Sequence, residues 1–359
     1  MNIIISNTTE FLYKKCVKPL FFKCDPETIH NHMVDMGATL GAHTVTNSLM
    51  KWSWAYQDKK YMKKIDGITF PNPVGLSAGF DYDGDLVQTI PSLGFGFHTI
   101  GTVSLKSYEG NPSPRLTRFP LSKSILVNKG LKNSGAPAII DKLSKVEMTI
   151  PVGISIASTN RQYKNEKEQI SEIIECFTLF EESSLKHSYY ELNISCPNTF
   201  GGEPFTTPDR LERLVAALDK IQLNKPVYVK MPIDQSDEET MALLTVLNNH
   251  NIQGVIFGNL TKDKTNPDVH SEDVAQWKQM KGNLSGKPTW KRSNHCIELC
   301  RSKFGKRFTI IGVGGIFSGE DAEKKMRLGA DLVQLITGVI YEGPQLIGKI
   351  NKHLSSTLV

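Results

Sequence analysis

The chain has 359 residues, of which 39% are hydrophobic and 22% charged, so it is long enough for an α/β barrel of about 250 residues with a short extension. A formal net charge of +5, without a basic stripe interleaved with aromatic residues, argues against a nucleic-acid-binding protein. No run of about 18 apolar residues is present, and the six cysteines form neither a CxxC pair nor a Cys/His cluster. We therefore expect no membrane-spanning helix and no metal site.

Residues 1–65 are predicted to form a helical N-terminal extension. Residues 7–23 mix phenylalanine and leucine with lysine, and a second helix begins after Asp25, with Asp25 as its N-cap and Pro26 in its first position. Two short helices with apolar faces and a rim of lysines suit a membrane interface. They suit packing against the rest of the chain equally well, and the pattern leaves both interpretations open.

Residues 66–359 are predicted to form a (β/α)₈ TIM barrel. Eight apolar runs without strict polar alternation indicate strands that are buried on both faces. They cover residues 73–80, 97–103, 151–157, 189–195, 226–232, 254–259, 308–314 and 332–337. Amphipathic segments between them, at 165–183, 208–221, 237–249 and 319–328, are predicted to be helices. Eight alternations favour a closed barrel over the second possibility, an open doubly wound sheet.

Two loops at the carboxyl ends of these strands carry residues suited to chemistry. The glycine-rich run 311–316 follows the seventh strand, where barrels commonly bind phosphate, although a tight turn also explains the glycines. The run 193–199 places Cys196 between asparagines, where it would serve as a proton-transfer base rather than as a buried small hydrophobe. Lys230 ends the fifth strand, where its side chain would either extend to the rim of the barrel or place a cation beside a cofactor.

These motifs together resemble the dihydroorotate dehydrogenase family. The resemblance is carried by NPVGLSAGFD at 72–81, EGNPSPRL at 109–116, NISCPNT at 193–199, LSGKP at 284–288, IGVGGI at 311–316 and GADLVQL at 329–335. The segment DPETIH at 25–30 resembles the N-terminal helices of the membrane-associated, quinone-using class of that family. The family resemblance implies FMN as cofactor, oxidation of dihydroorotate to orotate in pyrimidine biosynthesis, and transfer of the electrons to quinone or another acceptor.

The resemblance also implies a role for individual residues. The FMN ring and ribityl chain would be contacted by Ala78, Gly79, Thr102, Asn193 and Lys230. The phosphate would be held by Gly286, Gly314, Gly315, Ile336 and Thr337. The substrate would be bound by Asn128, Asn193, Asn198 and Asn259, with Cys196 as the catalytic base, and quinone would lie near His30 and Arg118. Residues 1–60 would contact the membrane, which predicts a peripheral protein on the cytoplasmic side or a cytoplasmic one.

Several positions depart from the family pattern, and they cluster on the substrate side. Cys196 stands where the quinone class has serine, Tyr82 replaces a lysine that contacts the substrate region, and Leu260 replaces threonine or serine. Without a gap, Val127 takes the place of a substrate asparagine, whereas a local shift would restore Asn128. Lys129 and Lys132 are candidates to compensate for the missing lysine.

These departures keep three alternatives open. The first is an FMN oxidoreductase of the same fold acting on another cyclic amide or dihydropyrimidine. The second is a flavin-binding barrel without turnover, which the Cys196 loop argues against, because a binding module gains nothing from a base. The third is a barrel that binds a phosphate compound other than FMN.

Overall fold

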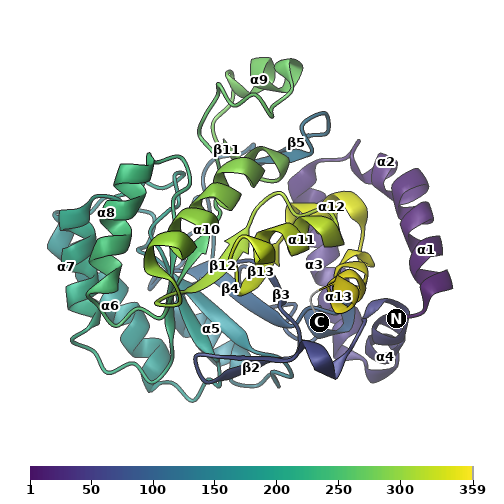
Figure 1. Cartoon of the computed structure of the whole chain (residues 1–359), viewed down its shortest axis with the longest axis horizontal. Coiled ribbons are helices and arrows are strands. Elements are labelled where there is room, and N and C mark those ends of the chain that lie inside the picture. The colour runs from purple at the N-terminus through teal and green to yellow at the C-terminus, as the bar shows by residue number, and fades with distance from the viewer. Residues whose placement is uncertain (358–359) are drawn as a thin grey trace.

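The computed structural model describes residues 1–357 and contains a closed barrel of eight parallel strands (Figure 1). The strands succeed one another around the barrel in chain order: β3 Val74–Leu76, β4 Phe97–Val103, β7 Val152–Ile156, β8 Tyr189–Asn193, β9 Val227–Met231, β10 Gly254–Phe257, β12 Thr309–Val313 and β13 Leu332–Leu335. Each predicted apolar run contains one of them, so the barrel is confirmed and the open sheet is excluded. Nearly all strand residues are buried, which is why the runs lack polar alternation.

Helices surround the barrel, and four of them lie in the segments predicted at 165–183, 208–221, 237–249 and 319–328. The surrounding helices are α5 Ala136–Leu143, α6 Glu166–Glu182, α7 Pro208–Leu218, α8 Asp237–Asn248, α9 Ser271–Trp277, α10 Trp290–Phe304, α11 Gly319–Arg327, α12 Thr337–Glu342 and α13 Leu346–Thr357. The Asn165 side chain caps α6, and a capping box of Ser236 with Glu239 begins α8. The segment between β3 and β4 contains only a 3₁₀ turn, η3 Ile90–Leu93. Helix α9 projects away from the barrel (Figure 1).

A short hairpin closes the amino-terminal end of the barrel. Strands β1 Lys63–Ile65 and β2 Ile68–Phe70 pair in antiparallel register, so the hairpin spans the expected boundary after residue 65. Phe70 is fully buried among aromatic side chains of the barrel interior, and Asp66 Oδ2 accepts hydrogen bonds from the Tyr228 hydroxyl at 2.9 Å and from Thr309 Oγ1 at 2.7 Å. With this end sealed, access is left at the carboxyl ends of the strands.

A small antiparallel sheet lies over that open end. It consists of β5 Leu116–Phe119 and β6 Ser124–Val127, inserted between β4 and β7, and of β11 Asn283–Leu284, inserted between β10 and β12. The 3₁₀ turn η4 Lys287–Thr289 follows β11 in the same insertion. Strand β6 pairs with both neighbours. The two insertions therefore form one wall above the barrel mouth.

The N-terminal extension is helical, as predicted, but contains more elements. Helix α1 Ile3–Leu12 continues through a π-helical turn, η1 Tyr13–Val17, into α2 Lys18–Phe21, and α3 Pro26–Ala42 follows with Asp25 as its N-cap. Helix α4 Thr44–Trp54 and the 3₁₀ turn η2 Lys59–Tyr61 were not predicted. The extension contacts the barrel through the Tyr13 hydroxyl, 2.6 Å from the carbonyl of Ile340. Among residues 1–357, no helix is both long enough and apolar enough to cross a bilayer.

Candidate active site

One large cavity opens at the carboxyl end of the barrel, with about 1210 Å³ of empty space, part of it open to solvent. Almost all of the predicted site residues lie on its walls. These are His30, Ala78, Gly79, Thr102, Asn193, Cys196, Asn198, Lys230, Asn259, Gly286, Gly314, Gly315, Ile336 and Thr337. Asn128 and Arg118 do not line it. The cavity therefore brings together residues from the strand ends, from the β5–β6–β11 sheet and from α3.

One end of the cavity is a recess built from glycine backbone. Gly314 and Gly315 follow β12 with φ of 98° and 73°, and Gly286 has a φ of 79°, a conformation that side-chain-bearing residues rarely adopt. A Cβ on Gly314 would lie 2.2 Å from Thr289 Oγ1, so no larger residue fits there. Glycine loops of this kind present backbone N–H groups to a phosphate. The recess suits the phosphate end of FMN.

A buried cation lies deeper in the cavity. Lys230 is 5% exposed, and its ammonium donates to Ser77 Oγ at 3.2 Å, the one side-chain hydrogen bond it makes among the described residues. Burial lowers the pKa of Lys230, and the charge of Glu191, buried on β8 inside the barrel, acts against that shift. The positive charge of this lysine is balanced by few neighbouring groups, so it would suit a position beside the electron-rich N1/O2 edge of a flavin ring. Sequence reasoning missed Glu191, although a glutamate inside an apolar strand is itself unusual.

Cys196 and its neighbours form another part of the cavity wall. Burial raises the pKa of the Cys196 thiol to about 11, while the backbone of Asn198 and the charge of Lys230 act in the opposite direction. Asn193 donates to Thr102 Oγ1 at 2.8 Å, and Asn259 donates to Ser195 Oγ at 2.7 Å. These bonds fix the orientation of both amides at the cavity wall.

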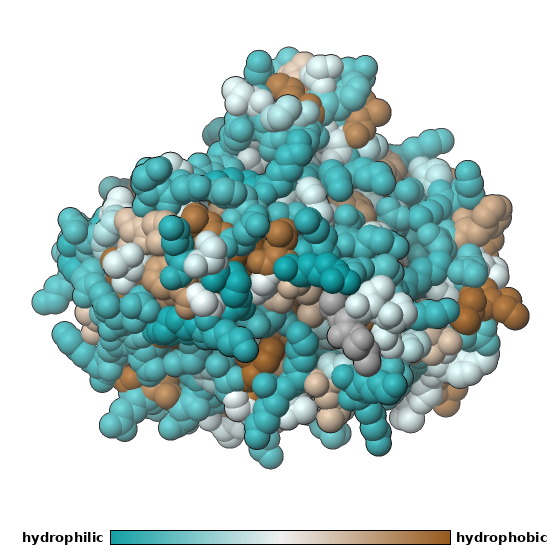
Figure 2. Space-filling view, viewed as in Figure 1, coloured by the Kyte–Doolittle hydropathy of each residue, from teal (hydrophilic) through white to brown (hydrophobic). Residues whose placement is uncertain are grey.

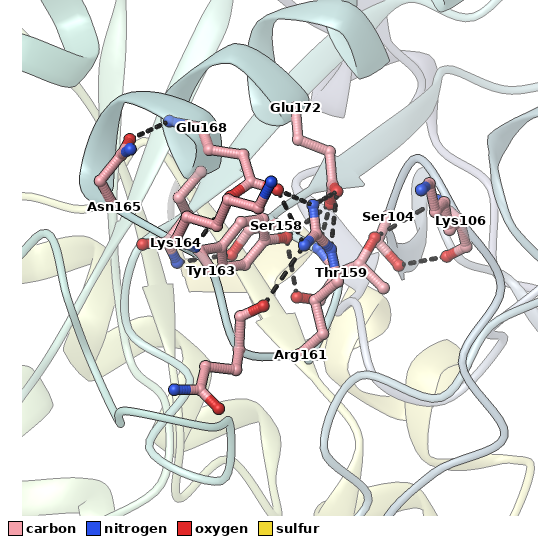
Figure 3. A network of polar contacts seen from close by, with 12 residues as sticks. Ser104, Lys106, Ser158, Thr159, Arg161, Tyr163, Lys164, Asn165, Glu168 and Glu172 are labelled. Carbon is pink, nitrogen blue, oxygen red and sulfur yellow. Dashed lines mark hydrogen bonds and ion pairs between the residues drawn. The ribbon is translucent and has the colours of Figure 1, made fainter.

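A polar network holds the loop that borders the Cys196 segment. Arg161 lies between Glu168 and Glu172, with N–O distances of 3.0 and 2.8 Å, and this anchors the chain between β7 and α6 (Figure 3). The preceding residue, Asn160, donates to the carbonyl of Gly130 at 3.0 Å and accepts from the N–H of Phe200 at 2.6 Å. The network thus ties the Cys196 loop to the segment after β6.

The positions that depart from the family pattern face the same cavity. Tyr82, Val127 and Leu260 all line it. The Asn128 side chain instead accepts a hydrogen bond from Asn111 Nδ2 at 3.0 Å, and Asn198 Nδ2 donates to the Val127 carbonyl at 2.9 Å. In the structure Val127, and not the predicted substrate residue Asn128, therefore faces the cavity.

An unpredicted ion pair lies beside Tyr82. Lys129 Nζ is 2.5 Å from Glu27 Oε1 on α3, and it lies 5.2 Å from the centroid of the Tyr82 ring. Arg115 shares the same carboxylate oxygen at 3.4 Å. Because Glu27 and Lys129 are 102 residues apart, no local sequence pattern reveals their contact.

The two residues expected near quinone have different surroundings. His30 packs edge-on against Phe80, with ring centroids 5.0 Å apart, and burial lowers its pKa to about 4, so the ring is neutral at neutral pH. Arg118 donates to the carbonyl of Cys24 at 2.8 Å and its guanidinium lies 4.9 Å over the Phe22 ring. His30 can therefore reach a ligand in the cavity directly, whereas Arg118 lies outside its walls in this conformation.

Comparison with known proteins identifies the family of this chain. The family model described as dihydroorotate dehydrogenase matches residues 61–358. The chain belongs to the dihydroorotate dehydrogenase family. It is 35% identical over 348 residues to a dihydroorotate dehydrogenase (quinone) of Christiangramia forsetii, covering 96% of this chain and 98% of that protein. It is 34% identical to a protein of the same name from Nostoc punctiforme, covering 97% and 94%.

Solved structures show the same architecture. The ligand-free DHODH of Eimeria tenella superimposes with a TM-score of 0.79 at 26% sequence identity, covering 93% of this chain and 95% of that one. The barrel and most of the N-terminal extension are therefore shared with that enzyme.

Proposed function

We propose that this protein is an FMN-dependent dihydroorotate dehydrogenase of pyrimidine biosynthesis that passes electrons to quinone. The observation that carries the proposal is one cavity in which the glycine recess, the buried Lys230 and the Cys196 loop converge at the carboxyl end of the barrel. Family membership and the similarity to quinone-using relatives support the same activity.

Each group has a defined task in that reaction. FMN, when bound, supplies the ring that accepts hydride from C6 of dihydroorotate. Cys196 Sγ, as thiolate, takes the proton from C5, which leaves the C5–C6 double bond of orotate. Asn193 and Asn259 are held by hydrogen bonds at the cavity wall, from which their amides orient the amide edges of the substrate. Lys230, which lines the same cavity, would hold positive charge beside the cofactor ring.

The N-terminal helices are proposed to guide quinone and to rest on a membrane surface. Their exposed apolar side chains are Ile3, Ile4, Phe11, Leu12, Leu20, Met36, Val45, Leu49 and Trp52. Figure 2 shows hydrophobic side chains in brown at the right-hand edge, where Figure 1 places α1 and α2. Lysines of the same helices would contact anionic headgroups, which would place the protein on the cytoplasmic side of the membrane.

The test is an anaerobic absorbance spectrum of the purified protein before and after dihydroorotate. We expect a flavin band that bleaches, and reoxidation of the band when a short-chain quinone is added. A yellow protein that dihydroorotate leaves unbleached would refute the proposed substrate. A protein without flavin absorbance would refute the cofactor.

The composition of the cavity wall on the substrate side supports a second candidate function. Tyr82, Val127 and Leu260 give the substrate side of the cavity a less polar wall than the family pattern has. Such a wall would suit a dihydropyrimidine or cyclic amide that lacks a carboxylate. Bleaching by dihydrouracil but not by dihydroorotate would favour this second function.

A further inference from the structure

The substrate side of the cavity lacks the lysine that the family places at position 82, and Tyr82 cannot replace its charge. Burial raises the pKa of Tyr82, so its hydroxyl stays neutral. Dihydroorotate and orotate each carry a carboxylate, and an anion that leaves water for a cavity needs a compensating cation. Another cation of this chain must therefore balance the charge of the substrate carboxylate.

Among the residues that the structure describes, three lysines and no arginine line the cavity. Lys230 donates to Ser77 Oγ at 3.2 Å and is the cation that the proposed function assigns to the cofactor. His30 contributes no charge at neutral pH, since burial lowers its pKa to about 4. Lys129 and Lys132 remain, and Lys129 is the one whose ammonium lies over the Tyr82 ring, at 5.2 Å from its centroid.

We propose that Lys129 is the specificity-determining cation that binds the substrate carboxylate, in place of the family lysine at position 82. This inference rests on the proposed function. The Lys129 ammonium has three N–H donors, of which Glu27 takes one. The side chain is 6% exposed, so a ligand in the cavity meets a cation already stripped of most of its water. Glu27 also forms an ion pair with Arg115, so the two cations and one carboxylate together carry one net positive charge.

The arrangement also makes the N-terminal extension part of the substrate site. Glu27 belongs to the first turn of α3, and its carboxylate holds Lys129 at the cavity wall. The substrate carboxylate and Glu27 are both anions that approach the same ammonium, so they repel each other. Removing the charge of Glu27 should therefore strengthen carboxylate binding while Tyr82 still packs against Lys129.

The experiment compares equilibrium binding of orotate with that of uracil, which lacks the carboxylate, by calorimetry on the FMN-loaded protein. In Lys129→Met, orotate should bind on the order of 10- to 100-fold more weakly, the usual effect of losing a charged hydrogen bond, and uracil should bind as before. Unchanged uracil binding also shows that the cavity has folded. Lys129→Arg should restore most of the orotate affinity.

Lys225→Met is the matched control. Like Lys129, Lys225 pairs with a glutamate and lies near a tyrosine ring: its ammonium is 3.1 Å from Glu181 and 5.9 Å from the Tyr190 ring centroid. Unlike Lys129, it does not line the cavity. This substitution should leave both affinities unchanged. If Lys129→Met does not fold, Glu27→Gln provides the second test, with an expected rise of a few-fold in the preference for orotate over uracil. Loss of that preference would contradict the assignment.

The failures can be told apart. If the wild-type protein is bleached by dihydroorotate and Lys129→Met binds orotate normally, or if Lys132→Met alone loses orotate, the assignment to Lys129 is wrong and the proposed function stands. If the wild-type protein binds uracil but not orotate, both fail.

Discussion

The pH dependence of flavin reduction tests the role of Cys196 most directly. The thiol must lose its proton before it can accept one from C5 of the substrate, and burial raises its pKa to about 11. The thiolate is then about 10⁻⁴ of the total at pH 7 and about 10⁻² at pH 9. We therefore expect the rate constant for anaerobic flavin bleaching at saturating dihydroorotate to rise about 100-fold between these values.

The stability of the fold sets the upper limit of the assay. The folded-state pKa of the Cys196 thiol lies above its ordinary value of 9.0, so the neutral thiol stabilises the folded protein below pH 9, and this contribution is lost as the pH rises through about 11. Stopped-flow measurements from pH 6 to 9 avoid that region.

Two variants complete the test of Cys196. Cys196→Ala should lower the bleaching rate by about 10²- to 10⁴-fold with FMN still bound. Cys16→Ala, which removes an exposed thiol, should leave it unchanged. A flat profile from pH 6 to 9, or undiminished reduction in Cys196→Ala, would refute the assignment of the base.

Further predictions concern the cofactor, the fold and the acceptor. Lys230→Met should weaken FMN binding by about 10-fold or more in fluorescence titrations, because its charge has little other compensation; equal affinity would contradict its place beside the ring. Gly314→Val should abolish FMN retention and cost about 1–3 kcal/mol of unfolding free energy in urea titrations, since φ is 98° there. Phe70→Ala should cost about 3–5 kcal/mol, whereas Met62→Ala, 54% exposed, should change stability by less than about 0.5 kcal/mol. His30→Ala should slow quinone-dependent reoxidation of the flavin while sparing its reduction, and equal reoxidation rates would exclude His30 from the quinone site.

Short sequence motifs predicted some residues of the site, whereas others depend on strand pairing. The recess glycines and the Cys196 loop stand in short motifs next to predicted strands, so their convergence at the barrel mouth followed from topology alone. The choice between Val127 and Asn128 did not, because β6 ends at Val127 and a shift of one residue there would turn the other side chain toward the cavity. Only the pairing of β6 with β5 and β11 decides that Val127 faces the cavity.

By itself the sequence determined the eight-stranded barrel, because parallel strands buried on both faces must be continuous apolar runs that the helices separate. It also determined the start of α3, since Asp25 and Pro26 act on adjacent backbone. The tertiary structure alone decided where the charges lie. Glu27 meets Lys129 across 102 residues, and Arg118 turns to Phe22 and the carbonyl of Cys24. Such contacts depend on how the helices dock on the barrel, and long polar side chains carry no periodic signal of the partner they will meet.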